Sequence, residues 1–439
     1  MNNKKQVEEI AKYFKSNEKE EENFNIGVEF EHFIVDKNSL KTISYYGTHG
    51  VEDTLKKLLS TGWQGKYEGD YLLGLSKDGT TITLEPGSQL ELSIKPYKNI
   101  EDIKKEYTRF LDEIVPILDA KNQTLIATGY QPESKISDIK IIPKKRYGYM
   151  FEYFKSKGRY AHNMMKGTAS VQLSIDYKSE EDYAKKFKIA NALSPVIYAM
   201  FDNSPFFEGN ESSEHCLRNI IWENCDSDRC GIVDKTFGGL FGYEQYAEYI
   251  LNKPPIFIDN GESIIFTDKK IYKEIFNPED YLLKELEHVL TMVFPDVRTK
   301  KYIEVRMMDA VPYPLNFAAI ALWKGILYDQ SNLDKVYEYV KTLNIDDINA
   351  AKKDIVEKGL YTNIKDKSVY EVGKWLIAIS KDKLSDIEKE YLMPLEDMIN
   401  SRKVPSQITK QRLELGKKEA LKWCFINNKL DRGDELWMQ

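Results

Sequence analysis

Residues 83–93 read TLEPGSQLELS, which places a carboxylate, a turn and a second carboxylate within eleven residues. Pro86-Gly87 is a turn signal, so segment 80–94 is expected to form a hairpin or a bent pair of strands. From residue 89 to residue 94, polar and apolar side chains alternate, which is the pattern of a half-buried β-strand. The polar face of this strand carries Gln89 and Glu91, although Thr or Lys would be enough for contact with solvent.

Three further predicted strands, at 26–36, 168–176 and 301–306, show the same peculiarity. Because residues i and i+2 of a strand point the same way, each strand gathers its polar side chains on one face. These side chains are Glu29 and Glu31 in the first strand, Thr168, Ser170, Gln172 and Ser174 in the second, and Glu304 and Arg306 in the third. If the four strands are neighbours, their polar faces form one surface rich in carboxylate.

This surface has two interpretations, of which the first is an ordinary solvent-exposed sheet face. Such faces usually mix Lys with Glu, whereas Glu29, Glu31, Glu91 and Glu304, with Glu85 at the turn, have no lysine on the same faces. Like charges at short range raise each other's pKa and repel unless cations intervene. Mg²⁺ accepts such oxygen ligands and completes its shell with water and phosphate. Together the strands favour the second interpretation, a site for Mg²⁺ and a nucleotide.

The phosphates of a nucleotide would also need cationic side chains. The candidates are Arg146 in PKKRYGYM (143–150), Arg218 in RNIIW (218–222), Arg229 in DSDRCG (226–231), and Arg306 on the last of the four strands. The planar guanidinium group suits phosphate or carboxylate. An ordinary surface ion pair is the alternative for each arginine alone. The chain has no G-x-x-x-x-G-K-[ST] motif, so a P-loop is excluded.

Composition narrows the classes of partner. The 439 residues carry a net charge of −7 and a pI near 5.6, so nucleic acid and anionic membrane surfaces are not expected as partners. No apolar run approaches the roughly 18 residues of a membrane span. The first residues form a charged amphipathic stretch without the apolar region of a signal peptide. The four cysteines include no CxxC pair, which predicts reduced thiols and a cytoplasmic location.

The order of the predicted elements indicates the fold class. Strands alternate with helices of varied length, hairpin signals are present, and no strand is a continuous apolar run, so we expect an α+β fold with an antiparallel sheet. A parallel doubly wound sheet is the less favoured alternative. From about residue 315 onward the pattern is helical. We interpret residues 1–439 as one catalytic domain, in which 331–439 is a mainly helical C-terminal part.

Several of these segments occur together, and in one order, in a known family. They include IGVEFEHFIVD, LEPGSQLELS, IPKKRYGYM, SVQLSIDY, RNIIWENCDSDRCG and FPDVRTKKYIEVR, all within residues 26–306. The set resembles the plant and proteobacterial type of glutamate–cysteine ligase. The resemblance implies a fold related to glutamine synthetase, in which a curved antiparallel sheet forms a funnel with helices packed outside.

The resemblance also implies a reaction. ATP would phosphorylate the side-chain carboxylate of glutamate, and the amine of cysteine would attack the acyl phosphate. The products would be γ-glutamylcysteine, ADP and phosphate, the first step of glutathione-type thiol synthesis. Two or three Mg²⁺ ions would be held by Glu29, Glu31, Glu85, Glu91 and Glu304. Arg146 and Arg218 match family arginines that contact substrate or nucleotide, while Arg229 and Arg306 match motif positions. Thr168, Ser170, Gln172, Trp222 and Ile256 would bind substrate in a monomer or homodimer.

The chain departs from the family pattern on the side of the amine acceptor. RTCTVQ is replaced by GTASVQ (167–172), MRGADGGP by VRMMDAVP (305–312), and a VPMY tyrosine by Ile256. Three alternatives therefore stay open: a γ-glutamyl ligase with another amine acceptor, a nucleotide-binding protein without turnover, and an unrelated Mg²⁺-dependent phosphotransferase on the same fold.

Overall fold

An open sheet of ten strands organises the molecule. The computed structural model describes residues 3–259, 264–267 and 269–427. The strand order is β14-β15-β7-β1-β5-β4-β3-β2, β6 also pairs with β1, and β18 pairs with β6. Every pair in this sheet is antiparallel. The strands are β1 (Ile26–Asp36), β2 (Gln64–Glu68), β3 (Tyr71–Lys77), β4 (Thr80–Leu84), β5 (Leu90–Tyr97), β6 (Gln123–Ile126), β7 (Ser170–Ile175), β14 (Val297–Thr299), β15 (Ile303–Asp309) and β18 (Phe425–Ile426).

The remaining strands form small two-stranded pairs outside this sheet. These are β8 (Phe206–Phe207) with β9 (Asn210–Glu211), β10 (Cys230–Gly231) with β13 (Phe294–Pro295), β11 (Phe257–Asp259) with β12 (Ile264–Phe266), and β16 (Asn363–Ile364) with β17 (Lys367–Ser368). The prediction of an α+β fold with an antiparallel sheet is confirmed, and the sheet is not closed.

The hairpin predicted around Pro86-Gly87 connects β4 and β5. The backbone amide of Glu85 donates to the carbonyl of Gln89 at 2.9 Å, and the amide of Ser88 donates to the carbonyl of Glu85 at 2.9 Å. A Cβ at Gly87 would lie 2.5 Å from the backbone oxygen of Lys166. Glycine is therefore required here, because it lets the turn approach helix α5 (Ala161–Gly167) closely.

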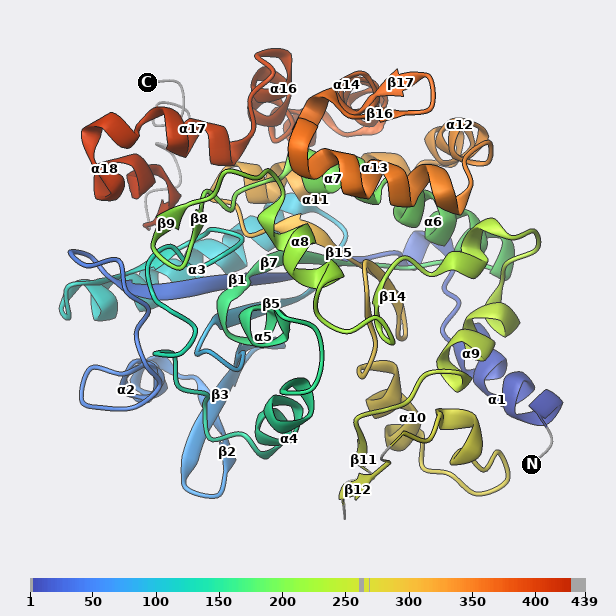
Figure 1. Cartoon of the computed structure of the whole chain (residues 1–439), viewed down its shortest axis with the longest axis horizontal. Helices are drawn as coiled ribbons and strands as arrows, with labels where there is room; N and C mark the ends of the chain where they lie inside the picture. Colours follow the sequence, from blue (N-terminus) through green and yellow to red (C-terminus); the bar gives the residue numbers. More distant parts are fainter. Residues whose placement is uncertain (1–2, 260–263, 268, 428–439) are drawn as a thin grey trace.

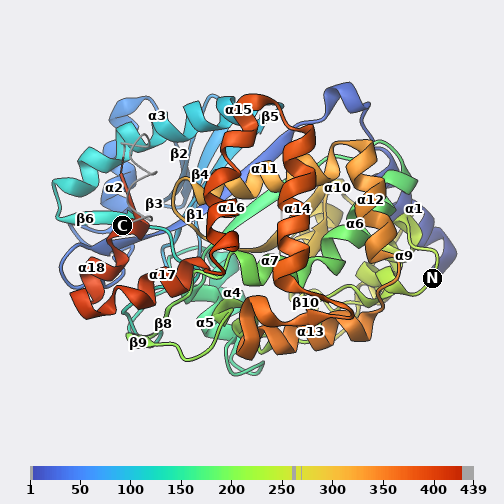
Figure 2. The ribbon, with the colours of Figure 1, turned by 90° about the horizontal axis from the view of Figure 1, so that it is seen from above.

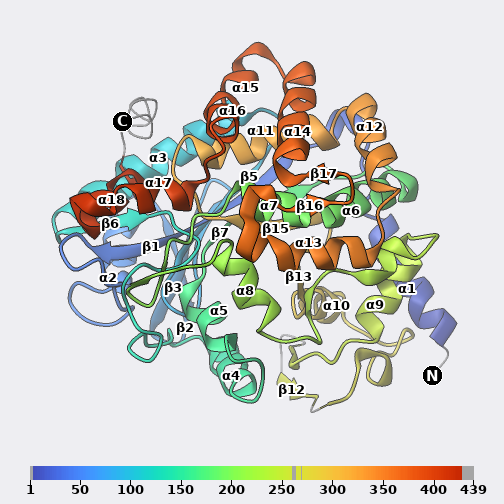
Figure 3. The ribbon, with the colours of Figure 1, turned by 45° about the horizontal axis from the view of Figure 1, so that its top comes forward.

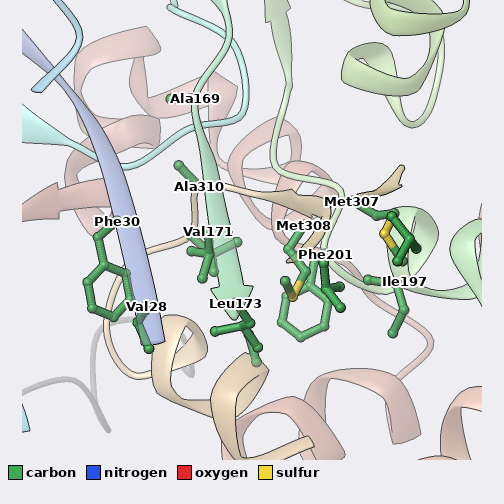
Figure 4. Close-up of a cluster of buried hydrophobic side chains, with 14 of the residues drawn as sticks. Val28, Phe30, Ala169, Val171, Leu173, Ile197, Phe201, Met307, Met308 and Ala310 are labelled. Carbon is green, nitrogen blue, oxygen red and sulfur yellow. The ribbon is translucent and has the colours of Figure 1, made fainter. Parts of the chain in front are cut away.

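One face of the sheet is apolar and forms the core. Val28 and Phe30 of β1, with Val171 and Leu173 of β7, are nearly fully buried, and they point to the same side in Figure 4. Helix α11 (Leu315–Leu327), buried over most of its length, contacts both strands. The opposite face carries the polar side chains, as the alternation predicts.

Helices cover both faces. On the polar side, α4 (Lys145–Phe154), α5 and α8 (Leu217–Glu223) follow one another in front of the sheet (Figures 1 and 3). Toward the other end of the sheet are α1 (Asn3–Lys15), α6 (Glu180–Ala192), α9 (Tyr243–Leu251) and α10 (Leu283–Leu290). Helices α2 (Val51–Leu58) and α3 (Ile100–Asp119) pack near β3, β5 and β6.

The described residues after 330 are mainly helical. Figure 2 shows several of the helices of this part in front of α11 and α7 (Ser194–Met200), while the last two lie at the left of the view. The helices are α12 (Gln330–Val340), α13 (Ile345–Lys358), α14 (Val369–Lys383), α15 (Asp386–Glu390), α16 (Met393–Asn400), α17 (Pro405–Gln411) and α18 (Lys417–Leu421). None of the helices in the described ranges is both long and apolar enough to span a membrane.

Candidate active site

A cavity of about 310 Å³ opens on the polar face of the sheet. Four carboxylates line it, together with five cations. The carboxylates are Glu29, Glu31, Glu85 and Glu91, and the cations are Lys144, Arg146, Arg218, Arg298 and Arg306. The strands β1, β4–β5, β7, β14 and β15 that supply many of these groups are far apart in sequence but adjacent in the sheet. The structure therefore brings the predicted acidic strand faces together.

Glu31 and Glu91 form the acidic centre of the cavity. They are directly opposed partners in the β1–β5 ladder. Glu31 accepts hydrogen bonds from the Ser170 amide (2.7 Å), the Ser170 hydroxyl (3.0 Å) and the Gln172 side-chain amide (2.8 Å). Burial, with the carboxylates of Glu85 and Glu91, raises the pKa of Glu31 to about 8. Burial and Glu85 also raise the pKa of Glu91.

Glu29 and Glu85 complete the set of four carboxylates that line the cavity. Glu29 faces Ser93 on one neighbouring strand and Gln172 on the other. Burial, followed by the Glu91 carboxylate, raises the pKa of Glu29 to about 7. Glu85 lies at the hairpin turn and accepts a hydrogen bond from the Tyr147 hydroxyl at 2.9 Å. These carboxylates carry charge that their protein neighbours do not fully compensate.

Glu304 differs from the four other glutamates. It is fully buried and outside the lining of the cavity. Its Oε2 atom accepts from Arg298 (2.6 Å) and Arg306 (2.9 Å), and its Oε1 atom pairs with Lys300 at 2.5 Å. Burial acts to raise the pKa of Glu304, but Arg298, Lys300 and Arg306 hold it well below its ordinary value. The expectation that no lysine accompanies these glutamates is wrong here, and Glu304 could bind a metal only by giving up one of these partners.

Glu304 instead connects two arginines of the cavity. Arg298 donates to it through Nε at 2.7 Å as well as through the terminal nitrogen. Arg306 bridges Glu304 and the side-chain oxygen of Gln172, to which it donates at 2.5 Å. Gln172 in turn donates to Glu31. A continuous chain of charged and polar contacts therefore runs from β14 through β15 and β7 to β1.

Arg146 and Arg218 lie on two short helices. Arg146 is in the first turn of α4 and donates to the Thr291 hydroxyl at 3.0 Å. Arg218 is on α8, and its terminal nitrogens donate to the backbone oxygens of Arg306 (2.9 Å) and Met307 (3.2 Å). Both short helices lie in front of the sheet (Figures 1 and 3), and both arginines line the cavity.

Helix α8 also presents two buried hydrogen-bond donors without an acceptor. In the described part of the chain, neither Arg218 Nε nor Trp222 Nε1 has a hydrogen-bond partner. The two residues are four positions apart, so they share one face of the helix. Both line the cavity, and the Arg218 guanidinium lies 5.7 Å from the centre of the Trp222 ring. Buried donors are usually paired, so this pair indicates the position of a ligand acceptor.

Thr168, Ser170 and Gln172, which were predicted to bind substrate, line the cavity. Ser170 and Gln172 hold Glu31 in place. Thr168 donates its hydroxyl to the backbone oxygen of Met164 at 2.7 Å, and its own carbonyl accepts from Gln89 at 3.0 Å. Thr168 therefore joins the start of β7 to the turn of the β4–β5 hairpin, whereas Ser170 and Gln172 join β7 to β1.

Arg229, predicted to be catalytic, and Ile256, predicted to bind substrate, lie outside the cavity lining. Arg229 is fully buried and pairs with Asp226 at 2.7 Å. It also donates to the backbone oxygens of Pro254 (2.7 Å) and Met292 (3.1 Å). Ile256 is 5% exposed and belongs to the hydrophobic core. Arg229 therefore holds loops together, and Ile256 is a packing residue.

The residues that replace family glycines are also in the core. Met307, Ala310 and Val311 are at most 2% exposed, and none of them lines the cavity. In Figure 4, Met307 and Met308 lie beside Ile197 and Phe201 of the α7 region. These departures from the family pattern therefore alter packing behind β15 and leave the cavity wall unchanged.

Sequence reasoning did not find every residue of the wall. Tyr147 and Met150 of α4, Met164 and Met165 of α5, and Thr291 and Phe294 before β14 also line the cavity. The RYGYM segment was a usable signal, since Tyr147 directly follows Arg146. The methionines could not be predicted as cavity residues, because an apolar residue on a short helix is expected to be buried in the hydrophobic core.

The fold and this cavity define an enzyme of the ligase class. The model of glutamate–cysteine ligase family 2 matches residues 25–420, and the chain belongs to this family. The chloroplastic glutamate–cysteine ligase of Nicotiana tabacum is 31% identical over 385 residues, covering 86% of this chain and 73% of the relative. The chloroplastic glutamate–cysteine ligase B of Oryza sativa subsp. japonica is 30% identical over 411 residues, covering 91% and 82%.

A solved structure supports the fold. The glutamate–cysteine ligase of Francisella tularensis, determined in complex with AMP, superposes with a TM-score of 0.57. The match covers 95% of this chain and 89% of that protein, at 13% sequence identity. At this identity the likeness concerns the fold alone.

Proposed function

We propose that the protein joins the side-chain carboxylate of glutamate to the amino group of cysteine at the expense of ATP. The observation that carries the proposal is the cavity itself, where Glu29, Glu31, Glu85 and Glu91 face a set of arginines and Lys144. Such a site can hold a metal–nucleotide complex and a carboxylate together. The names of the curated relatives agree with this reaction.

The carboxylates fit Mg²⁺. Burial, and after it the neighbouring carboxylates, raise the pKa values of Glu29, Glu31 and Glu91, and a bound divalent cation would favour their charged forms. Within the described ranges, no group of three or more His, Cys, Asp and Glu side chains is placed so that it could hold one metal ion. This agrees with Mg²⁺, which usually takes one or two carboxylates and completes its shell with water and phosphate. When bound, the ions would neutralise the phosphates of ATP.

The cations on the other side of the cavity would contact the phosphates and the glutamate. Arg298 and Arg306 are held at fixed positions by Glu304, so they are preorganised to stabilise charge on a transferred phosphoryl group. Arg146 and Lys144 approach from α4 and the residue before it. The free donors of Arg218 and Trp222 suit a carboxylate of glutamate, which would satisfy both.

The reaction would proceed in two steps, a phosphoryl transfer and then an acyl transfer. An oxygen of the glutamate side-chain carboxylate attacks the γ-phosphorus of ATP, the bond to the β-phosphate oxygen breaks, and ADP leaves. The amine of the acceptor then attacks the acyl carbon, a C–N bond forms, phosphate departs, and the amine loses a proton. The first step is needed because a carboxylate is a poor electrophile.

Cysteine is the acceptor that the cavity wall favours. Met150, Met164, Met165 and Phe294 give the cavity an apolar side. Methionine and aromatic groups are polarisable and accommodate a small thiol side chain. The replacements that cast doubt on the acceptor, at Ile256 and Met307, lie in the core. Another small amine remains the second candidate, because the apolar wall would contact the acceptor side chain without a hydrogen bond that is specific for a thiol.

The test is product analysis by mass spectrometry. The purified protein is incubated with Mg²⁺, ATP, glutamate and an equimolar mixture of cysteine, alanine and 2-aminobutyrate. We expect γ-glutamylcysteine as the main amide, with stoichiometric ADP and phosphate. Glu91→Gln serves as the inactive control. Hydrolysis of ATP without an amide product, or an amide that lacks glutamate, would contradict the proposal.

A further inference from the structure

Lys352 is a buried cation in the helical C-terminal part of the chain. It lies on α13 and is 3% exposed. Its Nζ atom pairs with Asp296 at 2.6 Å and with Glu223 at 2.5 Å. Burial acts to lower the pKa of Lys352, but Asp296 and Glu223 raise it above its ordinary value. Lys352 is therefore charged, and it joins two acidic residues that are 73 positions apart in the chain.

Both partners of Lys352 belong to elements that carry cavity residues. Glu223 is the last residue of α8 and directly follows Trp222. Asp296 directly precedes β14, which carries Arg298. The backbone oxygen of Asp296 also accepts from the amide of Arg306 at 3.1 Å. One lysine side chain therefore links the helix of Arg218 and Trp222 to the strands of Arg298 and Arg306.

Further bonds make this link rigid. The Asp296 carboxylate also accepts from the Ser194 hydroxyl and from the Tyr198 hydroxyl, the latter at 3.1 Å. The backbone oxygen of Lys352 accepts from the Asn219 side-chain amide at 3.1 Å, so α13 holds α8 at two points. Among the described residues after 331, none lines the cavity itself.

We infer that Lys352 is a positioning residue for the ligase reaction. It fixes α8 relative to β14, and so it sets the distance between Arg218 and Trp222 on one wall of the cavity and Arg298 on the other. The inference rests on the proposed function. It gives the C-terminal helices a part in substrate binding, although they contribute no group to the cavity. If the link is broken, α8 can shift, and groups on opposite walls no longer meet the same ligand.

A purely structural role for Lys352 is the competing explanation, and a matched control separates the two. Lys186 is 1% exposed, pairs with Asp182 at 2.8 Å and donates to the backbone oxygen of Asp176 at 2.9 Å. Neither Lys186 nor Asp182 lines the cavity. Lys186→Met therefore removes an equally buried lysine without breaking the link between α8 and β14.

The experiment compares Lys352→Met, Lys352→Arg, Glu223→Gln and Lys186→Met with the unchanged protein. Steady-state kinetics give KM for glutamate, and calorimetry gives the dissociation constant for Mg–ATP. We expect Lys352→Met to raise KM for glutamate at least tenfold and the dissociation constant at least fivefold, and Lys352→Arg to stay within threefold. Lys186→Met should lower the melting temperature with both constants within twofold.

Glu223→Gln covers the case in which Lys352→Met does not fold. The Glu223 side chain is 44% exposed, so loss of its charge should preserve the fold and raise KM for glutamate at least threefold. The inference is overturned if Glu223→Gln, and Lys352→Met where it folds, both keep KM for glutamate and the Mg–ATP dissociation constant within twofold of the unchanged protein. It is also overturned if Lys186→Met changes these two constants as much as Lys352→Met does. Turnover by the unchanged protein tests the proposed function separately. If the unchanged protein shows no turnover, the change in the Mg–ATP dissociation constant between the variants and the unchanged protein still tests the positioning role of Lys352.

Discussion

Glu31 on β1 and Glu91 on β5 are directly opposed in an antiparallel ladder, and both carboxylates face the same cavity. Like charges at directly opposed sheet positions are destabilising. In the protein without metal, burial and the carboxylates of Glu85 and Glu91 raise the pKa of Glu31 to about 8. Ionisation of both carboxylates is therefore unfavourable in the metal-free protein, and a bound divalent cation would reduce the repulsion between them.

The stability of the metal-free protein should fall as pH rises. Glu29 and Glu31 have folded-state pKa values of about 7 and about 8, above the roughly 4.3 of glutamate in an unfolded chain. Their contribution to stability is complete below the unfolded value and is lost as pH rises through 7 and 8. We expect the melting temperature in EDTA to drop between pH 5.5 and 8.5, less so in Glu31→Gln, and Mg²⁺ to restore it at pH 8.5. A melting temperature that rises over this range, relative to Glu31→Gln, would contradict the assignment.

Glu29→Gln and Glu304→Gln should have opposite effects on stability. Glu29 is repelled by Glu91 and Glu304, so its neutralisation should raise the melting temperature of the metal-free protein at pH 8. Glu304 compensates Arg298, Lys300 and Arg306, so its neutralisation should cost about 3–5 kcal/mol. Both variants should lose ligase activity. Calorimetric unfolding in EDTA measures the difference, and shifts of the same sign would reject the distinction between the two glutamates.

Arg146→Ala and Arg218→Lys should reduce kcat/KM by at least a hundredfold while the far-ultraviolet circular dichroism spectrum stays unchanged. Arg146 makes side-chain bonds only to Thr291 among the described residues, so the fold does not depend on it. In Arg218→Lys the charge stays but the Nε donor is lost. A charged ligand group left without its partner costs roughly 2–5 kcal/mol. Arg402→Ala, at an exposed position, is the control, and unchanged kinetics in both test variants would exclude these roles.

Ile256→Ala should leave acceptor preference unchanged. Ile256 is a core residue outside the cavity lining, so its truncation should cost about 2–5 kcal/mol of stability and keep the cysteine-to-alanine product ratio within twofold. Met164→Ala removes a similar apolar volume from the cavity wall and should change that ratio. Competition assays with both amines measure it. A changed ratio in Ile256→Ala and an unchanged one in Met164→Ala would reverse the assignment of the acceptor wall.

The sheet and its acidic face could be predicted from sequence because period-two alternation directly encodes which residues share a face. Glu29, Glu31 and Glu91 were found in this way and Glu85 from the turn signal beside it, and all four line the cavity. The β2–β3 hairpin was not predicted. Its sequence, QGKYEGDYLLGLSK (64–77), contains no clear alternation.

The remaining part of the site depends on tertiary contacts that no local pattern encodes. Helices α5 and α8 have seven residues each, too few for a helical period to emerge in a segment with turn signals. Strand alternation placed Glu304 on the polar face, but only the paired register of β14 and β15 shows that Arg298 and Lys300 neutralise it. Arg229 matched a motif, and its burial against Asp226 follows from loop packing alone.

The transfer of oxygen from glutamate to phosphate tests the central claim most directly. Glutamate labelled with ¹⁸O in its side-chain carboxylate is incubated with the protein, Mg²⁺, ATP and cysteine, and the released phosphate is analysed by mass spectrometry. Formation of an acyl phosphate predicts one ¹⁸O atom in the phosphate for each molecule of γ-glutamylcysteine, with ADP as the nucleotide product. Amide formation with unlabelled phosphate, or with AMP in place of ADP, would contradict the proposed reaction in this cavity.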